Sequence, residues 1–598
     1  MPGERRVLDS WKEIAVYLGR TEKTCRDWER HFGLPVHRLT DSAKARVFAF
    51  SDEIDAWRDR RALFPHIKDE ESPPRSGPSP RPTARRIVWG FLLAVSTAGV
   101  ILLTWMYLGR PSVDGRVAGS DRPSRSSIAV LPFVDLSPNK QYEYLCDGMM
   151  DTVINALASV KGLHVTARTS ALKYKGRPLD VRKIGKELNV ENLLEASVQV
   201  TGGEIRVTAQ LNDCRTGYHL WSKKFDRRMD SVSSLFEIHD EIARAIVETL
   251  RAEHLGEADE RPKARPTDSL EAYNLYLLGR HLWNMRGKDN LLKAVDYYQR
   301  ALDIDAEFAS PYMGLAEVYL TLWDNLELPP AECVQKAKQF AQKTLALDPE
   351  NAGAHVCLAV IRSSVDFDFA GSEAGFRRSL DLNPGDAFAH QAYAFYLSDV
   401  GRPGEAITEM KLARDLDPLA PRIRANVGHV LCRAAKYEEA RQELEEALKI
   451  DPRHPTTYAY LSEVCRMTGR YEEGVAHIKK AIALLDYPGF SAQLAIMYAE
   501  SGETDRARAM IEELIGRAKT EFVSTVYLAA AFGSVGDMDI AFRLLEEAFA
   551  YGDARLISLG ADPMFSMFRS DPRFFAILKR IGISDQPWIG VKYEPKGK

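Results

Sequence analysis

The sequence is poor in cysteine, and its few cysteines form no metal-binding or disulfide pattern. Seven occur in 598 residues, with no CxxC pair and no Cys/His cluster. This excludes a zinc-ribbon domain and a dense disulfide framework. Cys146 and Cys214 fall in one predicted domain, and the sequence leaves open whether they pair. We expect no metal site and no cofactor.

Catalytic signatures are also missing. The chain has no Gly-rich phosphate loop, no HRD-like loop, no GxSxG and no HExxH motif, which argues against kinase, hydrolase and metalloprotease chemistry. Asp147, Asp151, His219 and Asp226 could be imagined as an acid/base or metal group, but no ligand spacing connects them. We interpret the carboxylates as helix N-terminal and turn residues, and we predict that the protein is not an enzyme.

An excess of either charge is absent too. The 80 Lys and Arg side chains stand against 84 Asp and Glu, a net charge of −4. Any nucleic-acid binding must therefore be confined to one part of the chain. At this length several domains are expected, because single hydrophobic cores stop growing at about 250–300 residues.

Long apolar runs are missing except for one, residues 87–108. This run has 22 residues and no charge, and about 20 apolar residues suffice to span a bilayer. Basic and aromatic residues mark its two ends: Arg81, Arg85, Arg86, Trp89, Trp105, Tyr107 and Arg110. A buried core helix is the alternative, but the length and the basic flanks favour a single transmembrane helix.

The first 64 residues predict two helices followed by a small β-hairpin and a closing helix. Ser10 can cap a helix with an apolar face, and after Gly19 a second helix follows over TEKTCRDWERHF. Lys23, Arg26 and Arg30 lie on one exposed face of that second helix. A helix, a tight turn and a helix is the layout that places a second helix in the DNA major groove.

The head, residues 1–64, resembles the winged helix-turn-helix of the MerR and excisionase families, through RDWERHFGLPVHR, RVFAF and the closing helix with Ile54 and Trp57. That resemblance implies that the second helix reads DNA and that the hairpin wing clamps the backbone. The alternative is a small protein-interaction module with a solvated charged face. The candidate DNA-binding residues are Thr21, Lys23, Thr24, Arg26, Arg30, Arg38, Lys44 and Arg46.

Arg26 and Arg30 are expected to carry most of the DNA affinity of the head. Replacing both by alanine is expected to cost several kcal/mol of binding free energy and to flatten its salt dependence, because fewer counterions are released. Binding isotherms at several salt concentrations measure both effects, and an unchanged isotherm would refute the assignment.

Residues 65–86 predict a disordered tether, since they are rich in Pro, Ser and Arg and poor in apolar residues. Charge leaves the membrane orientation open: five Lys and Arg precede the apolar run within residues 67–86, and four follow it within 109–128. A DNA-binding head requires a cytoplasmic N-terminus. This predicts a single-pass protein of a bacterial inner membrane, with a linker over 109–126 and a periplasmic C-terminal region.

Residues 127–252 predict an α/β domain. SIAVLPF and LHVTA read as strands, Tyr142 to Val160 and VRKIGKELNV as helices, and residues 192–226 as a three-stranded meander. The domain resembles the TolB amino-terminal-like domain through AVLPF, CDGMMDTVINALA and EASVQVTGGEIRVTAQLNDCRTGYHLWSKKFD. The resemblance implies an envelope-facing or sensory module without a shared catalytic motif.

Residues 270–550 contain a repeat. Asp-Pro or Asn-Pro recurs at Pro349, Pro384, Pro418 and Pro452, at intervals of 35, 34 and 34 residues. A period of 34 with two helices per unit resembles the tetratricopeptide family, which implies an all-α solenoid that binds peptides or protein segments. The sequence accommodates eight units. Each has one small residue at the position where its two helices are expected to touch: Ala294, Ala337, Ser372, Ala406, Ala440, Gly474, Ala507 and Ala541.

Two further predictions concern side chains of the solenoid. Tyr393, Tyr458 and Tyr498 fall at core positions and are not expected to form a ligand cage. Residues 551–598 form a C-terminal cap and tail, with four residues expected to cover the last repeat: Phe565, Phe568, Phe575 and Leu578.

These parts together predict a membrane-anchored one-component transcriptional regulator. The head would bind DNA, the repeats would bind a protein or peptide, and two chains would pair so that two heads read two half-sites. The layout is similar to ToxR- and CadC-type membrane regulators, although the head here is MerR-like. The alternative is a membrane-anchored scaffold that assembles protein complexes without binding DNA.

Overall fold

The computed structural model describes residues 7–8, 10–18, 25–26, 34–38, 47–50, 54, 127–160, 162–177, 180–251, 267–324 and 330–583. The chain divides into two compact units, residues 1–118 and 119–598. The predicted tether and transmembrane helix, residues 65–108, lie outside the described residues. None of the helices that the structure does describe is long and apolar enough to cross a bilayer.

The head contains a short helix and a three-stranded antiparallel sheet. Its elements are β1 (Val7–Leu8), α1 (Trp11–Leu18), β2 (His37–Arg38) and β3 (Val47–Phe50), and β3 is the central strand. The Glu13 amide lies 3.3 Å from Ser10 Oγ, in agreement with the predicted cap. The predicted pair of strands is confirmed by β2 and β3. Strand β1 is not predicted by the sequence, because two residues are too few to show an alternation.

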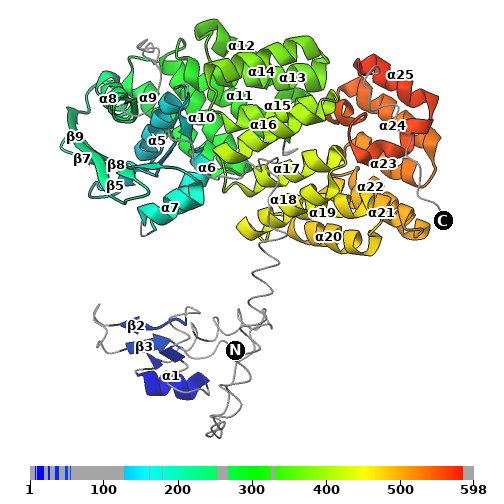
Figure 1. Ribbon diagram of the computed structural model, residues 1–598, viewed down its shortest axis with the longest axis horizontal. Coiled ribbons are helices and arrows are strands. Elements are labelled where there is room, and N and C mark those ends of the chain that lie inside the picture. Colours follow the sequence, from blue (N-terminus) through cyan, green and yellow to red (C-terminus); the bar gives the residue numbers. More distant parts are fainter. Residues whose placement is uncertain are drawn as a thin grey trace, which may run out of the picture. The chain divides into compact units, whose positions relative to one another are not determined.

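The second unit begins with a mixed sheet, seen with its helices at one end of the repeat array in Figure 1. Strands β6, β4 and β7 are parallel neighbours, β7, β8 and β9 form an antiparallel meander, and β5 pairs with β7. The strands are β4 (Ser127–Val130), β5 (Val134–Asp135), β6 (His164–Val165), β7 (Asn192–Thr201), β8 (Glu204–Asp213) and β9 (His219–Arg228). The helices are α5 (Glu143–Ala158), α6 (Arg168–Ala171), η1 (Leu172–Tyr174), α7 (Val181–Leu188) and α8 (Val232–Arg251). The predicted α/β order is confirmed.

Successive residues of β4 face different cores, as the two-residue period of a strand requires. Ile128 and Val130 pack with α5 and α8, whereas Ala129 packs with α7. Cys146 belongs to the first core and Cys214 to the second. Both thiols are free, because the sheet lies between them.

Eight helical hairpins follow within the described part of residues 267–551. Their helices are α9 (Leu270–Met285), α10 (Lys288–Ile304), α11 (Ala309–Asp324), α12 (Pro330–Leu347), α13 (Ala352–Ile361), α14 (Phe369–Leu382), α15 (Ala387–Asp399), α16 (Pro403–Leu416), α17 (Pro421–Arg433), α18 (Tyr437–Ile450), α19 (Pro455–Met467), α20 (Tyr471–Leu484), α21 (Pro488–Glu500), α22 (Thr504–Arg517), α23 (Thr525–Ser534) and α24 (Met538–Tyr551). All eight small residues that defined the units are buried. At Gly428 an added Cβ would lie 2.5 Å from Leu444 Cγ, so the hairpin needs a small side chain there too.

The two helices of a hairpin differ in burial. In α17 eight of thirteen residues are buried, whereas in α18 only Ala440, Leu444 and Ala447 of fourteen are. A helix buried nearly all round lies inside, and a helix with one buried stripe lies at the surface. We call the first helices of the hairpins the inner layer and the second helices the outer layer. The three predicted core tyrosines are buried in the inner layer.

The C-terminal cap consists of η3 (Ala554–Ser558), η4 (Pro563–Ser570) and α25 (Pro572–Ile581). Phe565, Phe568 and Leu578 are buried, as predicted. The prediction for Phe575 is wrong, because its side chain is 39% exposed and Phe574 is fully buried instead. Helix α25 starts at Pro572 with Asp571 as its cap. This start places Phe574, not Phe575, on the apolar face.

Candidate functional site

Two of the eight predicted DNA-binding residues lie among the described residues. Arg26 is exposed, and its guanidinium carbon lies 5.4 Å from the centre of the Trp11 ring. Arg38 ends strand β2, of which the backbone is described. The other six lie outside the described residues: Thr21, Lys23, Thr24, Arg30, Lys44 and Arg46. The DNA assignment therefore stays a prediction.

A partly buried cluster of charges joins the α/β domain to the first repeat. Arg168 of α6 lies 3.2 Å from Asp147 Oδ1 and 2.6 Å from Asp151 Oδ1, both on α5. His281 of α9 donates to Asp147 Oδ2 at 2.8 Å, and Arg280 of α9 lies 3.9 Å from Asp151 Oδ2. The cluster thus connects α5 and α6 of the sheet domain with α9 of the solenoid.

The cluster keeps Asp147 ionised. Burial alone would raise the pKa of this carboxyl, but the His281 hydrogen bond and the charges of Arg168 and Lys175 hold the pKa below its ordinary value. The interpretation of Asp147 and Asp151 as helix N-terminal or turn residues is wrong, since both lie within α5 beyond its first turn. The sequence carries one usable signal: two carboxylates four residues apart repel on a lone helix, so they call for a basic partner.

His219 and Asp226, the other two residues considered as an acid/base or metal group, lie elsewhere. His219 Nδ1 pairs with Asn212 Oδ1 at 2.5 Å at the end of the β8–β9 hairpin. Asp226 lies on β9 and pairs with Arg206 of β8 at 2.6 Å, with both side chains more than half exposed. Its interpretation as a turn residue is wrong, because it lies within a strand. The four residues therefore share no common site.

A second contact joins the α/β domain to the loop after α16. The Ala167 amide donates to Leu416 O at 2.7 Å, and the Leu419 amide donates to Ser170 Oγ at 2.8 Å. Ser170 Oγ in turn donates to Asp417 Oδ1. Burial raises the pKa of Asp417 to about 6 although Ser170 bonds to it. The Asp-Pro loop that marks the repeat in the sequence is therefore also a docking point for the sheet domain.

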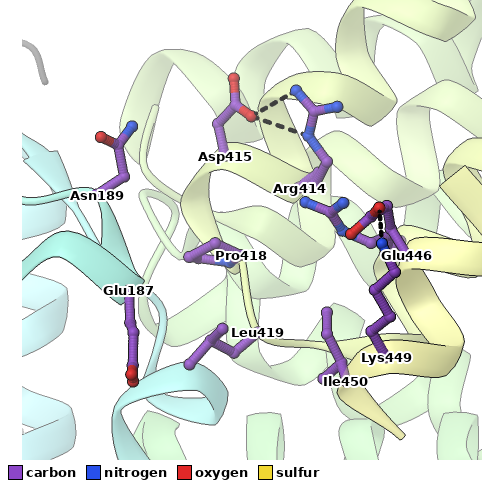
Figure 2. A pocket seen from close by; sticks show the side chains of 10 residues that line it. Glu187, Asn189, Arg414, Asp415, Pro418, Leu419, Glu446, Lys449 and Ile450 are labelled. Carbon is purple, nitrogen blue, oxygen red and sulfur yellow. Dashed lines mark hydrogen bonds and ion pairs between the residues drawn. The ribbon is translucent and has the colours of Figure 1, made fainter. Parts of the chain in front are cut away.

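A cleft of about 490 Å³ opens beside this contact (Figure 2), between α7 and the fourth and fifth repeats. Arg414 pairs with Asp415, and Lys449 pairs with Glu446 at 2.5 Å. The lining residues are Glu187, Asn189, Arg414, Asp415, Pro418, Leu419, Arg424, Glu446, Lys449 and Ile450. Three cations face three carboxylates over a small apolar floor, an arrangement that matches a polypeptide segment of mixed charge better than a bare anion. No Ser, Cys or His is among these lining residues, so the cleft offers no nucleophile–base pair.

One group of described residues has metal-ligating atoms close together: Cys465, Glu473 and His477, within 4.8 Å of one another. The Glu473 carboxylate is already paired with Arg441 at 3.4 Å and with Arg470 at 3.3 Å. Burial raises the pKa of the Cys465 thiol to about 12. We interpret the group as a contact between α19 and α20, since two arginines oppose a cation there.

Comparison with protein families identifies a tetratricopeptide repeat at residues 421–454, which is the α17–α18 hairpin and its loop. The match supports the predicted tetratricopeptide repeats at this hairpin. Solved structures with low overall similarity include YrrB, described as a TPR protein with an unusual peptide-binding site (18% identity, 32% of this chain and 92% of that one, TM-score 0.24). Another comes from a functional characterization of Pseudomonas aeruginosa pilF (21% identity, covering 36% of this chain and 93% of that one, TM-score 0.29).

Two curated relatives match larger parts of the chain. Putative adenylate cyclase 3 of Rhizobium meliloti is 33% identical over 242 residues, 40% of this chain and 41% of that protein. Transcriptional regulator HilA of Salmonella typhimurium is 20% identical over 298 residues, 50% of this chain and 52% of that protein. The chain thus spans about half the length of the curated relatives it matches.

Proposed function

We propose that the protein is a membrane-anchored transcriptional regulator whose α/β domain and repeats sense a protein partner. The observation that carries this proposal is the buried junction of the two regions. Arg168, Asp147 and His281 tie the sheet domain to the first repeat, and Ser170 ties it to the fourth. A partner that binds the repeats therefore acts on one continuous body and not on a loosely tethered domain.

DNA binding is proposed for the head. The exposed Arg26 beside a helix and a strand pair fits a winged reader of DNA. The similarity to a protein named a transcriptional regulator supports a role in transcription regulation. We propose that two chains pair, because one small head buries too little DNA surface for tight binding.

The proposed topology places the head in the cytoplasm and residues 119–598 in the periplasm of a bacterium. An alkaline phosphatase fused after residue 598 is expected to be active, because this enzyme acquires its disulfides only in an oxidising compartment. Fusion of the same enzyme after residue 64 is the matched control and is expected to be inactive. An inactive C-terminal fusion together with an active control would reverse the orientation.

A membrane-anchored scaffold is the second proposal, favoured by the repeats themselves, since tetratricopeptide arrays present extended surfaces to proteins. In a scaffold the head would bind protein. Crosslinking in cells separates the two proposals: a scaffold recovers protein partners through residues 267–583 and no DNA.

Catalysis is not proposed, although one relative carries the name of a cyclase. The match to that protein covers 41% of its length, and the chain carries none of the catalytic motifs sought in the sequence. We propose that the shared part serves interaction. Cyclic nucleotide formation by the purified chain would contradict this.

A further inference from the structure

The cleft shown in Figure 2 has walls from two domains, and we call it the composite cleft. The sheet domain contributes Glu187 and Asn189 at the end of α7. The fourth and fifth repeats contribute the end of α16, the loop after it, the start of α17 and the end of α18. Most of this repeat wall therefore belongs to the outer layer and not to the inner layer. The volume of about 490 Å³ falls within the range of about 300–1,000 Å³ that is typical of ligand sites.

The floor of the composite cleft is apolar and is shared by both domains. It consists of Pro418, Leu419 and Ile450 (Figure 2). Leu419 packs against the apolar core that α7 shares with β4, and its amide donates to Ser170 Oγ at 2.8 Å. The floor is thus part of the contact that docks the sheet domain on the repeats, so the cleft has this form only while the two are docked.

Arg424 stands where the composite cleft meets a second hollow of about 340 Å³, because it lines both. Its side chain is 23% exposed and lies 3.5 Å from Glu443 Oε2, whereas Arg414 takes the other oxygen of this carboxylate at 2.6 Å. Arg424 Nε meets no acceptor within the described part of the chain. A carboxylate shared with Arg414 balances the charge of Arg424 only in part, and a carboxylate from a partner can complete the pairing.

The α7 wall of the composite cleft is negative. Glu187 is exposed, 3.9 Å from the exposed Lys183. Asn189 caps the C-terminus of α7, where a helix carries a partial negative charge. On the repeat wall, Lys449 pairs with Glu446 in an exposed position, and such pairs exchange readily with other charges because water screens them. The repeat wall can therefore take a carboxylate, and the α7 wall attracts a cation.

We propose that the composite cleft binds a partner segment in which an acidic and a basic side chain flank an apolar one. The acidic side chain pairs with Arg424 and Lys449, the basic one pairs with Glu187, and the apolar one lies on the floor. This inference rests on the proposed binding of a protein partner and assigns that partner a site outside the inner layer. Because the segment touches α7 and the repeats at once, its binding strengthens the docking of the sheet domain.

The test begins with short random peptides displayed on phage and selected on the full-length chain purified in detergent. The selected peptides are expected to share an acidic and a basic residue that flank an apolar one. Selected peptides without this pattern, or the absence of any selected peptide, would overturn the proposal.

Fluorescence anisotropy with one labelled, selected peptide then measures the role of each wall. The variants R424Q and E187Q each remove one charge, and the glutamine introduced by E187Q can still accept the hydrogen bond from Tyr174. Each variant is expected to raise the Kd at least about tenfold, since each leaves one charge of the peptide unpaired. E187K is expected to bind weakly too, and to regain affinity when the basic residue of the peptide is replaced by an acidic one. An unchanged Kd in R424Q and E187Q, or no such rescue, would overturn the proposal.

The matched control variant is R580Q, because Arg580 pairs with Glu546 at the surface and is not among the residues that line the cleft or the second hollow. It is expected to leave the Kd unchanged. Hydrogen exchange then locates the peptide, which is expected to slow exchange in residues 186–190 and 416–420 together and not in α19 and α21. Protection of the inner layer alone would overturn the cleft site and leave protein binding by the repeats standing, so the two failures are distinguishable.

Discussion

Replacing Asp147 by alanine is expected to lower the free energy of unfolding by about 3–5 kcal/mol, the usual cost of breaking a buried ion pair. The side chain is 9% exposed and accepts from His281 while it faces Arg168 and Lys175. Its removal leaves Arg168 paired with the Asp151 carboxylate and with the backbone carbonyl of residue 147, and leaves His281 without that acceptor. Urea unfolding of the full chain measures the loss.

Asp226→Ala is the matched control, because Asp226 pairs with Arg206 in an exposed position. Exposed ion pairs contribute little to stability because water and salt screen them, so this variant is expected to unfold almost like the unmodified chain. Asp147→Ala is also expected to speed proteolysis between the sheet domain and the first repeat. Equal unfolding of the two variants would show that the cluster does not hold the junction.

Acidification from pH 7 to pH 4 is expected to destabilise the second unit strongly through two buried histidines. Burial lowers the pKa of His239 to about 4 and that of His429 to about 3, from an ordinary value of 6.5. At a pH below 6.5 but above its folded-state pKa, each histidine binds a proton in the unfolded chain and not in the folded chain. Stability is therefore fully present above pH 6.5 and falls with pH below it, by about 3 kcal/mol for each histidine at pH 4.

The double variant H239L and H429L tests the origin of this acid loss. His239 is buried beside Phe236, and His429 stacks on Tyr460 with ring centroids 4.3 Å apart. Leucine cannot be protonated, so urea unfolding between pH 7 and pH 4 is expected to show a much smaller slope for the variant. Asp417, whose pKa burial raises to about 6, acts in the opposite direction and remains in both proteins. An unchanged slope would assign the acid loss to other groups.

The repeats could be predicted because their determinants are local and recur. A small residue at one position of each hairpin and a proline after the second helix follow from how two adjacent helices pack. The meander could also be predicted from the sequence. Gly202 and Gly203 mark its first turn, where both have positive φ, and apolar and polar residues alternate in the strands on either side.

The contacts between distant segments could not be predicted. Asp147 and His281 are 134 residues apart, and Ser558 and Asp399 are 159 apart. No period or spacing relates such pairs, and each side chain looks like an ordinary helix or loop residue on its own. The exposed Phe575 is a different case: Phe574, Ile577, Leu578 and Ile581 follow the helical period, so the capping residue Asp571 would have fixed the correct face.

The proposed regulatory function depends most directly on whether the full-length chain binds DNA in its own cells. A genome-wide footprint after crosslinking is expected to show enrichment at a few discrete promoters. That enrichment is expected to vanish when Arg26 and Arg30 are both replaced by alanine, while the amount of membrane-bound protein stays the same. If the unmodified protein enriches no genomic locus above background, the result contradicts a tethered transcriptional regulator. The membrane-anchored scaffold then remains as the proposed function.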